Sequence, residues 1–236
     1  MTDIEFHRKI RSYVRRDGRM TEAQKLAYHE YWPSFGLTID NGKINFEQVF
    51  QRKAPTILEI GFGSGQSLLS TARLQADINF VAIEMHLPGI GALLLGMQRQ
   101  KINNIRVYYA DAVEVMEQCI PENSLDGIQI FFPDPWRKRK HHKRRLIQTE
   151  FATLLSSRLK VGGTVHLATD WEDYALHMMK VLSEIPTLTN LVGDKQFADR
   201  SGGRPIITKF EQRGLRSGRQ IYELQFSKND FSRNIS

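Results

Sequence analysis

Short apolar runs alternate with longer amphipathic stretches through most of the sequence. The apolar runs predict strands over residues 56–61, 79–84, 105–111, 125–132 and 163–170. Helix-length stretches follow them at 66–75, 88–101, 112–118, 143–159 and 171–185. This alternation predicts βαβ units around a mostly parallel sheet, and the nearly continuous apolar strands indicate that helices cover both faces. A later segment, 220–227, alternates apolar and polar residues and predicts a strand near an edge of the sheet.

The first 50 residues have a different pattern. Glycine or proline interrupts them at positions 18, 33, 36 and 42, too often for long regular elements. One short helix is predicted after Thr21, because Thr21 and Gln24 have the spacing of a capping box. We therefore expect residues 1–50 to form a basic, partly flexible extension and residues 51–236 to form the main domain.

The composition is that of a globular protein. Hydrophobic residues make up 41% and charged residues 25% of the 236 positions, which excludes a disordered or fibrous chain. Cys119 is the single cysteine, so an intrachain disulfide and a cysteine-rich zinc site are excluded and a reducing compartment is favoured. The charged N-terminal segment does not resemble a secretory signal, and no stretch is apolar enough to cross a bilayer. These features predict a cytoplasmic protein without a membrane partner.

Positive charge is concentrated in three segments. The net charge is +7, and residues 136–145 alone carry seven Lys and Arg and no acid. Segments 1–25 and 195–219 are also basic, so the rest of the chain is mildly acidic. Most charge runs are solvated surface, but seven cations within ten residues repel one another unless a partner neutralises them. The distribution therefore favours a polyanion such as a nucleic acid as the partner.

A glycine-rich loop joins the first strand and first helix of the predicted main domain. Gly61, Gly63 and Gly65 would let the backbone turn tightly and approach a ligand, although glycines at such turns also serve packing alone. Gln66 stands where a dinucleotide-binding fingerprint requires glycine. Glu59 precedes the loop with a negative charge that would repel a pyrophosphate. The expected ligand is therefore cationic or neutral.

Two further acids end the next two predicted strands. Glu84 is placed to hold ribose hydroxyls, and Asp111 to accept from an adenine amino group or from the neighbouring backbone. Either acid alone could simply cap the following helix. With Glu59 and the glycine loop, however, they form a set that looks like the cofactor site of a class I S-adenosylmethionine methyltransferase. A carboxylate facing the cationic methionine end of that cofactor is electrostatically favourable.

The fourth predicted strand leads into Phe132-Pro133-Asp134-Pro135-Trp136. Proline on each side of Asp134 predicts extended backbone at Phe132 and Asp134, in a stiff loop that presents one carboxylate and one indole. A rigid turn with a packed tryptophan is the simpler explanation of such a loop. The basic run that follows directly favours a functional one, namely methyl transfer to a nucleic acid.

The sequence from Phe131 to Leu146, FFPDPWRKRKHHKRRL, resembles the signature of the bacterial tRNA (guanine-N7-)-methyltransferase family. The resemblance continues in RSYVRRDGRMTEAQ, ILEIGFGSGQSL, IEMHLPGIG, ADA, ATDWEDY and RPIITKFEQRG. Ala82 departs from it, since glycine is expected before Ile-Glu there. The resemblance implies a class I methyltransferase fold with a mostly parallel seven-stranded sheet and a final antiparallel strand. It also implies methyl transfer from S-adenosylmethionine to guanine 46 in the tRNA variable loop.

The resemblance assigns roles to several groups of residues. It implies that Glu59, Glu84, Asp111 and Asp134 contact the cofactor or its surroundings, with Asp134 as the catalytic candidate. Substrate contacts are implied for Lys138, Asp170, Thr208, Lys209, Phe210 and Glu211. RNA contacts are implied along Lys140, His141, His142, Lys143, Arg144 and Arg145. No metal is expected, because nothing near the paired histidines completes a metal site.

Three other functions stay open on the sequence alone. A methyltransferase of the same fold could act on protein or on another RNA position, although the basic run argues against protein. A non-catalytic RNA-binding protein could retain the fold, but the four intact acids argue for cofactor binding. A nicotinamide-dependent oxidoreductase is disfavoured by Gln66.

Overall fold

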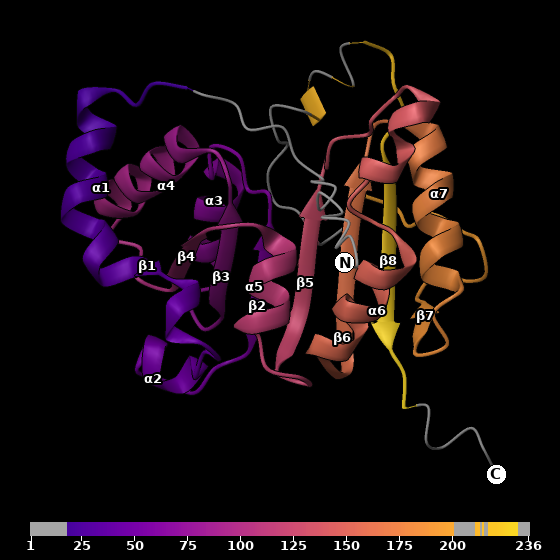
Figure 1. Ribbon diagram of the computed structural model, residues 1–236, viewed down its shortest axis with the longest axis horizontal. Coiled ribbons are helices and arrows are strands. Elements are labelled where there is room, and N and C mark those ends of the chain that lie inside the picture. Colours follow the sequence, from indigo (N-terminus) through magenta and orange to yellow (C-terminus); the bar gives the residue numbers. More distant parts are fainter. Residues whose placement is uncertain (1–17, 201–210, 213, 215–216, 231–236) are drawn as a thin grey trace, which may run out of the picture.

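The computed structural model describes residues 18–200, 211, 212, 214 and 217–230, and one sheet forms its centre (Figure 1). The strands are β1 (Gly36–Leu37), β2 (Thr56–Ile60), β3 (Asn79–Glu84), β4 (Ile105–Tyr109), β5 (Leu125–Phe131), β6 (Leu159–Thr169), β7 (Leu188–Asn190) and β8 (Tyr222–Lys228). Within the described residues they form an eight-stranded sheet in the order β1-β4-β3-β2-β5-β6-β8-β7. The neighbouring strands from β1 to β6 pair parallel, whereas β8 pairs antiparallel with both β6 and β7.

This sheet confirms the predicted α/β fold and differs from the prediction in one detail. The expected seven strands are joined by β1, which comes from the segment predicted to be an extension and pairs with β4. Strand β8 lies near an edge of the sheet, as predicted, with β7 pairing along its outer side.

Helices cover both faces of the sheet, as expected. They are α1 (Glu22–Phe35), α2 (Phe46–Phe50), α3 (Gln66–Leu74), α4 (Leu87–Gln100), α5 (Ala112–Gln118), α6 (Thr149–Arg158) and α7 (Glu172–Ser183), with 3₁₀ turns η1 (Ile39–Asn41) and η2 (Arg139–Arg144). Successive residues of β3 point to opposite faces. Phe80 and Ala82 join a core with α3 and α4, whereas Val81 and Ile83 join the core that contains α5, α6 and α7. The sheet is thus buried on both sides, which explains its apolar strands.

Helix α1 contradicts the expectation of no long element in the first 50 residues. The predicted capping box of Thr21 and Gln24 is present and starts a 14-residue helix that contains Pro33. Its partner is α4, where Gly91 lies against Met20 and Gln24 so closely that an added Cβ would stand 2.7 Å from the methionine sulfur. Tertiary packing against α4 therefore supports a helix that local sequence signals do not predict.

The helix predicted over 143–159 begins later than expected. Arg145 has extended backbone (ψ 134°), and α6 starts only at Thr149. Residues 139–144 form η2 instead, so the basic run is a compact turn between the sheet and α6. Among the described residues, no helix is both long and apolar enough to cross a membrane.

Candidate active site

The glycine loop lies between β2 and α3 and has left-handed backbone at three positions. Gly61, Gly63 and Gly65 have φ values of 77°, 60° and 72°, which residues with a Cβ rarely adopt. The Gly63 N–H donates to the carboxylate of Glu84 at 2.9 Å. A Cβ built on Gly61 or Gly63 would meet no atom of the described residues within 4 Å, so these residues leave the backbone of the loop open. A ligand can therefore lie directly against this loop.

The start of helix α4 supports the loop from behind. A Cβ built on Gly89 would stand 2.1 Å from the carbonyl oxygen of Gly63. This contact is with backbone, which cannot rotate away as a side chain would. The closeness of α4 to the loop therefore depends on the absence of a side chain at position 89.

The acids that end β2 and β3 have different surroundings. Glu59 is buried, and burial, followed by the charge of Glu84, raises the pKa of its carboxyl to about 8. Glu84 is half-buried and accepts from the backbone N–H groups of Met85 at 2.7 Å and His86 at 3.0 Å. Backbone N–H groups thus hold the Glu84 carboxylate, whereas burial disfavours the charge of Glu59, and a cationic ligand would favour the ionised form of Glu59.

Asp111 follows β4 and caps helix α5. Its Oδ1 atom accepts from the N–H groups of Val113 at 2.8 Å and Glu114 at 3.4 Å. The helix-cap role that the sequence left open is thus present. Because both bonds use Oδ1, the role does not conflict with a ligand contact through Oδ2.

The loop after β5 leaves the sheet through a sharp turn that the sequence did not predict. Phe132 has a φ of 53°, whereas the residue before a proline was expected to be extended. Its N–H still donates to the carbonyl of Ala168 on β6 at 2.8 Å, so the chain must turn immediately after a sheet hydrogen bond. Trp136 also has a positive φ, 45°. Asp134 stands between these two turns and is close enough to Tyr174 for its charge to add to the burial that raises the pKa of Tyr174.

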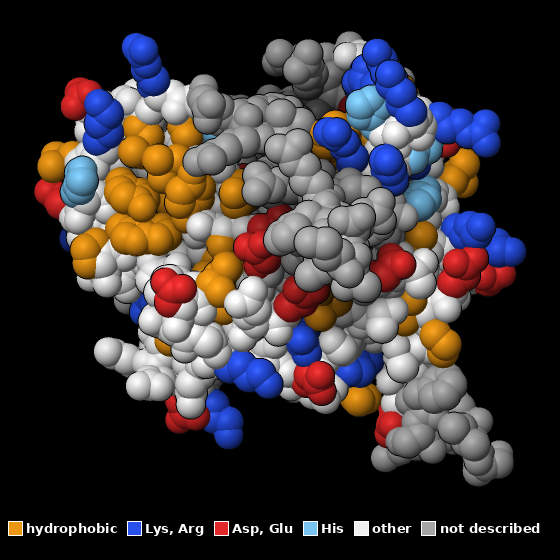
Figure 2. All heavy atoms as spheres, viewed as in Figure 1, with side chains coloured by type: hydrophobic (Ala, Val, Ile, Leu, Met, Phe, Trp, Pro, Cys, Tyr) orange, Lys and Arg blue, Asp and Glu red, His pale blue; other side chains and the backbone are white. Residues whose placement is uncertain are grey.

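The basic run forms an exposed cluster above η2, visible as a blue group at the upper right of Figure 2. We call its exposed cations the basic strip: Arg137, Lys138, Arg139, Lys140, Lys143 and Arg144. Trp136 packs beneath it, stacked parallel to His141 at 5.9 Å between ring centroids, with the Arg144 guanidinium 5.0 Å from its ring centre. Partial burial, followed by the charges of the neighbouring Arg144 and Lys140, lowers the pKa of His141 below its ordinary value. The strip thus adjoins the loop that carries Asp134.

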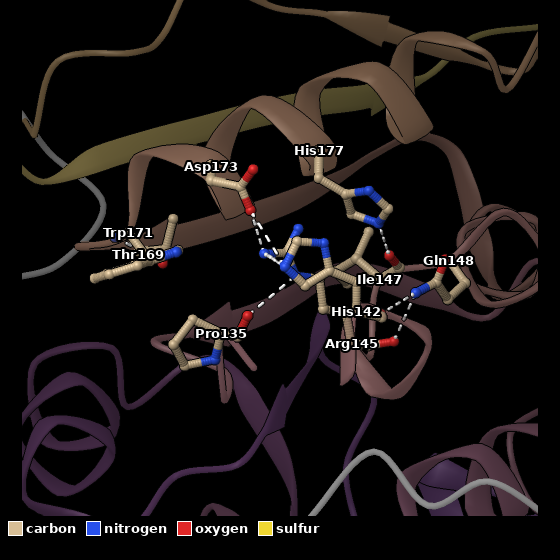
Figure 3. A network of polar contacts seen from close by, with 9 residues as sticks. All are labelled: Pro135, His142, Arg145, Ile147, Gln148, Thr169, Trp171, Asp173 and His177. Carbon is tan, nitrogen blue, oxygen red and sulfur yellow. Dashed lines mark hydrogen bonds and ion pairs between the residues drawn. The ribbon is translucent and has the colours of Figure 1, made fainter. Parts of the chain in front are cut away.

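Arg145 departs from the RNA contact expected for it. Its side chain is 1% exposed, and its Nε atom donates to the carbonyl of Pro135 at 3.0 Å. Its Nη2 atom pairs with Asp173 on α7 and lies 3.1 Å from the Nε2 atom of His142 (Figure 3). The last cation of the run is therefore part of the protein interior rather than of its charged surface.

Asp170 lies at the same edge of the sheet, directly after β6. Its Oδ2 atom accepts from Arg219 Nη1 at 2.7 Å. The indole of the next residue, Trp171, lies near two guanidinium groups, that of Arg137 at 4.6 Å and that of Arg219 at 5.8 Å. Sequence reasoning missed Trp171, Arg137 and Arg219 as a group, because their contacts join three distant segments.

Glu211 is fully buried and paired with Arg200. Burial of a carboxylate is costly without a partner, and the pair, in turn, raises the pKa of Arg200. The neighbouring predicted substrate residues Thr208, Lys209 and Phe210 lie outside the described residues. The structure therefore places one of these four expected residues.

Residues 53–224 match the sequence model of a family described as "Putative methyltransferase". The tRNA (guanine-N(7)-)-methyltransferase of Idiomarina loihiensis is 48% identical over 95% of this chain and 91% of its own length. The protein of the same name from Pseudomonas syringae pv. tomato is 49% identical, with the same two coverages.

The chain belongs to the tRNA (guanine-N7-)-methyltransferase family. Solved structures of other methyltransferases share its fold. The 16S rRNA methyltransferase KamB has a TM-score of 0.56 at 14% identity and covers 78% of this chain and 93% of its own. The aminoglycoside resistance methyltransferase NpmB1 has a TM-score of 0.54 at 16% identity, covering 81% and 94%. At these identities the likeness shows the fold alone.

S-adenosylmethionine is the methyl donor that membership in this methyltransferase family implies, and the residues of the loop fit it. The part of the chain that the structure describes leaves room for a ligand against the backbone of Gly61 and Gly63, and the buried Glu59 suits its cationic methionine end. Glu84 ends β3 and Asp111 follows the adjacent strand β4, at the edge of the sheet where ribose and adenine would lie. In the part of the chain that the structure describes, no three His, Cys, Asp or Glu side chains group to hold a metal.

Proposed function

We propose that this protein transfers a methyl group from S-adenosylmethionine to N7 of guanine 46 in the variable loop of cytoplasmic tRNA. The observation that carries the proposal is the junction of two features at one edge of the sheet. The acids that fit the cofactor and the loop of Asp134 lie at the carboxyl ends of the parallel strands, and the basic strip adjoins that loop. Support for tRNA guanine N7 comes from the relatives' names, and support for position 46 from the family signature.

The reaction requires little proton transfer by the protein. Guanine N7 already carries a free lone pair, so it needs no general base to become a nucleophile. Bound S-adenosylmethionine supplies an electrophilic methyl group on a sulfonium. The protein's task is to align N7 with that methyl carbon, to exclude water and to oppose the positive charge that develops on the purine.

We assign to Asp134 the role of opposing the positive charge that develops on the purine. A fixed carboxylate near the base can accept from its amino or N1 donors and offset the developing charge. The two positive-φ turns at Phe132 and Trp136 restrict where the loop can place this carboxylate. Asp170 would hold the base from the next strand end, with Arg219 fixing its orientation. Glu211 and Lys138 complete the proposed substrate contacts.

The basic strip would hold the tRNA backbone. The target base in folded tRNA is buried by stacking or tertiary pairing, and extruding it costs on the order of a few kcal/mol. Phosphate contacts from exposed cations such as Lys140, Lys143 and Arg144 would offset that cost. His141, stacked on Trp136, would add contact area beside them.

The deciding experiment maps the product. Bulk tRNA lacking the modification would be methylated in vitro with S-adenosylmethionine, then cleaved by borohydride and aniline, which is specific for N7-methylguanosine. Cleavage at position 46 alone is expected. Cleavage at another guanine would move the site within tRNA, whereas methyl transfer into protein and not into tRNA would reject the proposal. Asp134→Asn serves as the matched control for enzyme-dependent cleavage.

A further inference from the structure

Arg145 is the feature that the proposed function leaves unused. It ends a run of seven cations within ten residues, yet its side chain is 1% exposed while Lys140, Lys143 and Arg144 are exposed. A long charged side chain is seldom fully buried unless it is paired. The burial of Arg145 therefore points to partners for its guanidinium within the protein.

The Arg145 guanidinium connects three segments. Nε donates to the carbonyl of Pro135, the residue directly after Asp134, at 3.0 Å. Nη2 reaches Asp173 on α7 and the ring of His142 on η2 (Figure 3). The guanidinium also lies 4.8 Å from the ring centre of Tyr174, a fully buried residue of α7. One side chain thus ties the loop of Asp134 to α7.

The backbone around Arg145 is fixed by separate contacts. The Gln148 amide donates to the carbonyls of His142 at 3.0 Å and Arg145 at 3.3 Å. The Ile147 N–H donates to the Tyr174 hydroxyl at 3.2 Å, and the Ile147 carbonyl lies 2.8 Å from the His177 ring nitrogen. The position from which Arg145 reaches the loop is therefore well defined.

We propose that Arg145 is a positioning residue that sets the place of the Asp134 carboxylate through the Pro135 carbonyl, rather than a contact to RNA. This inference rests on the proposed catalytic role of Asp134. The guanidinium holds its donors in a rigid planar fork, so Nε reaches the loop carbonyl while Nη2 reaches the α7 carboxylate. A lysine ammonium is a compact charge whose donors rotate, and it cannot reproduce that fixed geometry. Small displacements of an aligned group of about 1 Å can cost on the order of 10² in rate.

The test compares two buried arginines. Arg158 also donates to a backbone carbonyl, that of Met116 at 2.9 Å, and pairs with an exposed acid, Glu122, at 3.3 Å. It lies at the end of α6, next to the start of β6 and away from the Asp134 loop. Arg145→Lys and Arg158→Lys would be compared in single-turnover methylation at saturating tRNA and S-adenosylmethionine, at a temperature where both variants are folded.

Arg145→Lys is expected to slow the chemical step about 10²-fold, with tRNA affinity and its salt dependence unchanged, while Arg158→Lys keeps the wild-type rate. A wild-type rate for Arg145→Lys, or an equal loss in both variants, would overturn the proposal. So would weaker tRNA binding with a shallower salt dependence, since that marks a phosphate contact.

If Arg145→Lys does not fold, Asp173→Asn provides a second variant. It keeps an acceptor for the Arg145 guanidinium and removes the negative charge of Asp173. A rate loss smaller than 10²-fold is then expected, and no loss would reject the role.

A double variant tests whether Arg145 acts through Asp134. If it does, Arg145→Lys should slow the reaction little further in an Asp134→Asn background, because the positioned charge is already gone. Full additivity would mean that Arg145 acts independently and would overturn the proposal. A fast Asp134→Asn enzyme would reject the role of Asp134 and the present inference with it. If Asp134→Asn slows methyl transfer and Arg145→Lys keeps the wild-type rate, only the role of Arg145 is rejected.

Discussion

Glu59, one residue before the end of β2, lies near Glu84, the last residue of the adjacent strand β3, and the charge of Glu84 adds to the burial that raises the pKa of Glu59 to about 8. In the free protein at pH 7, Glu59 is therefore mostly protonated. A cationic ligand stabilises the ionised form and lowers this pKa again. Ligand binding and proton release at Glu59 are thereby linked.

Cofactor affinity should rise with pH between 5.5 and 7. Each bound S-adenosylmethionine is expected to release up to one proton from Glu59, so the dissociation constant should fall by up to about tenfold per pH unit. Calorimetry in two buffers of different ionisation enthalpy measures this release directly. Glu59→Gln should bind more weakly and release no proton, and a wild-type affinity independent of pH would contradict the linkage.

Glu59→Gln should also stabilise the cofactor-free protein. The folded-state pKa of about 8 lies above the ordinary value of 4.5. The contribution of Glu59 to the free energy of unfolding is therefore fully present at low pH. That stability is lost as pH rises through about 8, because only the unfolded state ionises readily. A glutamine does not ionise, so the variant keeps this stability at high pH. Each kcal/mol of unfolding free energy regained at pH 8 should raise the melting temperature by about 2–4 °C. Melting curves at pH 5 and pH 8 check this, and a variant that melts below wild type at pH 8 would contradict it.

Asp134→Asn should slow methyl transfer while preserving the loop. The substitution keeps the side-chain size and the flanking prolines but removes the negative charge. Losing one such electrostatic contact typically costs about 10²–10³ in rate, and the loss should fall on the chemical step. Single-turnover methylation measures it, with tRNA affinity and a melting curve as controls. A normal rate from a less stable variant would leave Asp134 as a turn residue only.

Removing charge from the basic strip should weaken tRNA binding and leave the affinity for S-adenosylmethionine unchanged. Alanine at Lys140, Lys143 and Arg144 is expected to make the slope of log affinity against log salt shallower by about 0.7–0.9 per lost phosphate contact. Arg99, exposed near the end of α4, supplies the control substitution, which should leave the slope unchanged. Equal slopes in the triple variant and the wild type would mean that the strip is only solvated surface.

Gly89→Ala should weaken cofactor binding through the backbone of the glycine loop. The new methyl would stand 2.1 Å from the Gly63 carbonyl oxygen, so the loop or α4 must move. Gly96→Ala is the matched control on the same helix, because its methyl would meet the flexible side chain of Leu69 instead. We expect at least about a tenfold loss of S-adenosylmethionine affinity for Gly89→Ala alone, consistent with typical costs of overpacking. Equal affinities of the two variants would show that the loop tolerates the displacement.

The sequence predicted best what depends on local pattern. The alternation of strands and helices, and the acids at the ends of β2, β3 and β4, follow from periodicity and from the geometry of parallel sheets. The Thr21 capping box was also found, because its two residues lie three positions apart.

What the sequence did not predict depends on distant partners. Helix α1 is longer than its own pattern indicates because α4 packs against it. Arg145 could not be told from its neighbours in the basic run, since its burial requires Asp173 and Tyr174 from another helix. The left-handed turn at Phe132 likewise comes at a residue whose N–H is bonded to Ala168 on β6, a distant partner that a local proline rule does not include.

The pairing of β1 with β4 has a practical consequence for self-association. Gly36 and Leu37 lie opposite Val107 and Tyr108, and they occupy the outer side of a strand that would otherwise end the sheet. A protein trimmed to the family match at 53–224 would lose them and leave the backbone of β4 open to a strand from another molecule. Gly36 and Leu37 thus cover the edge of β4 and oppose edge-to-edge aggregation. Shortened versions of the protein made for expression should retain them.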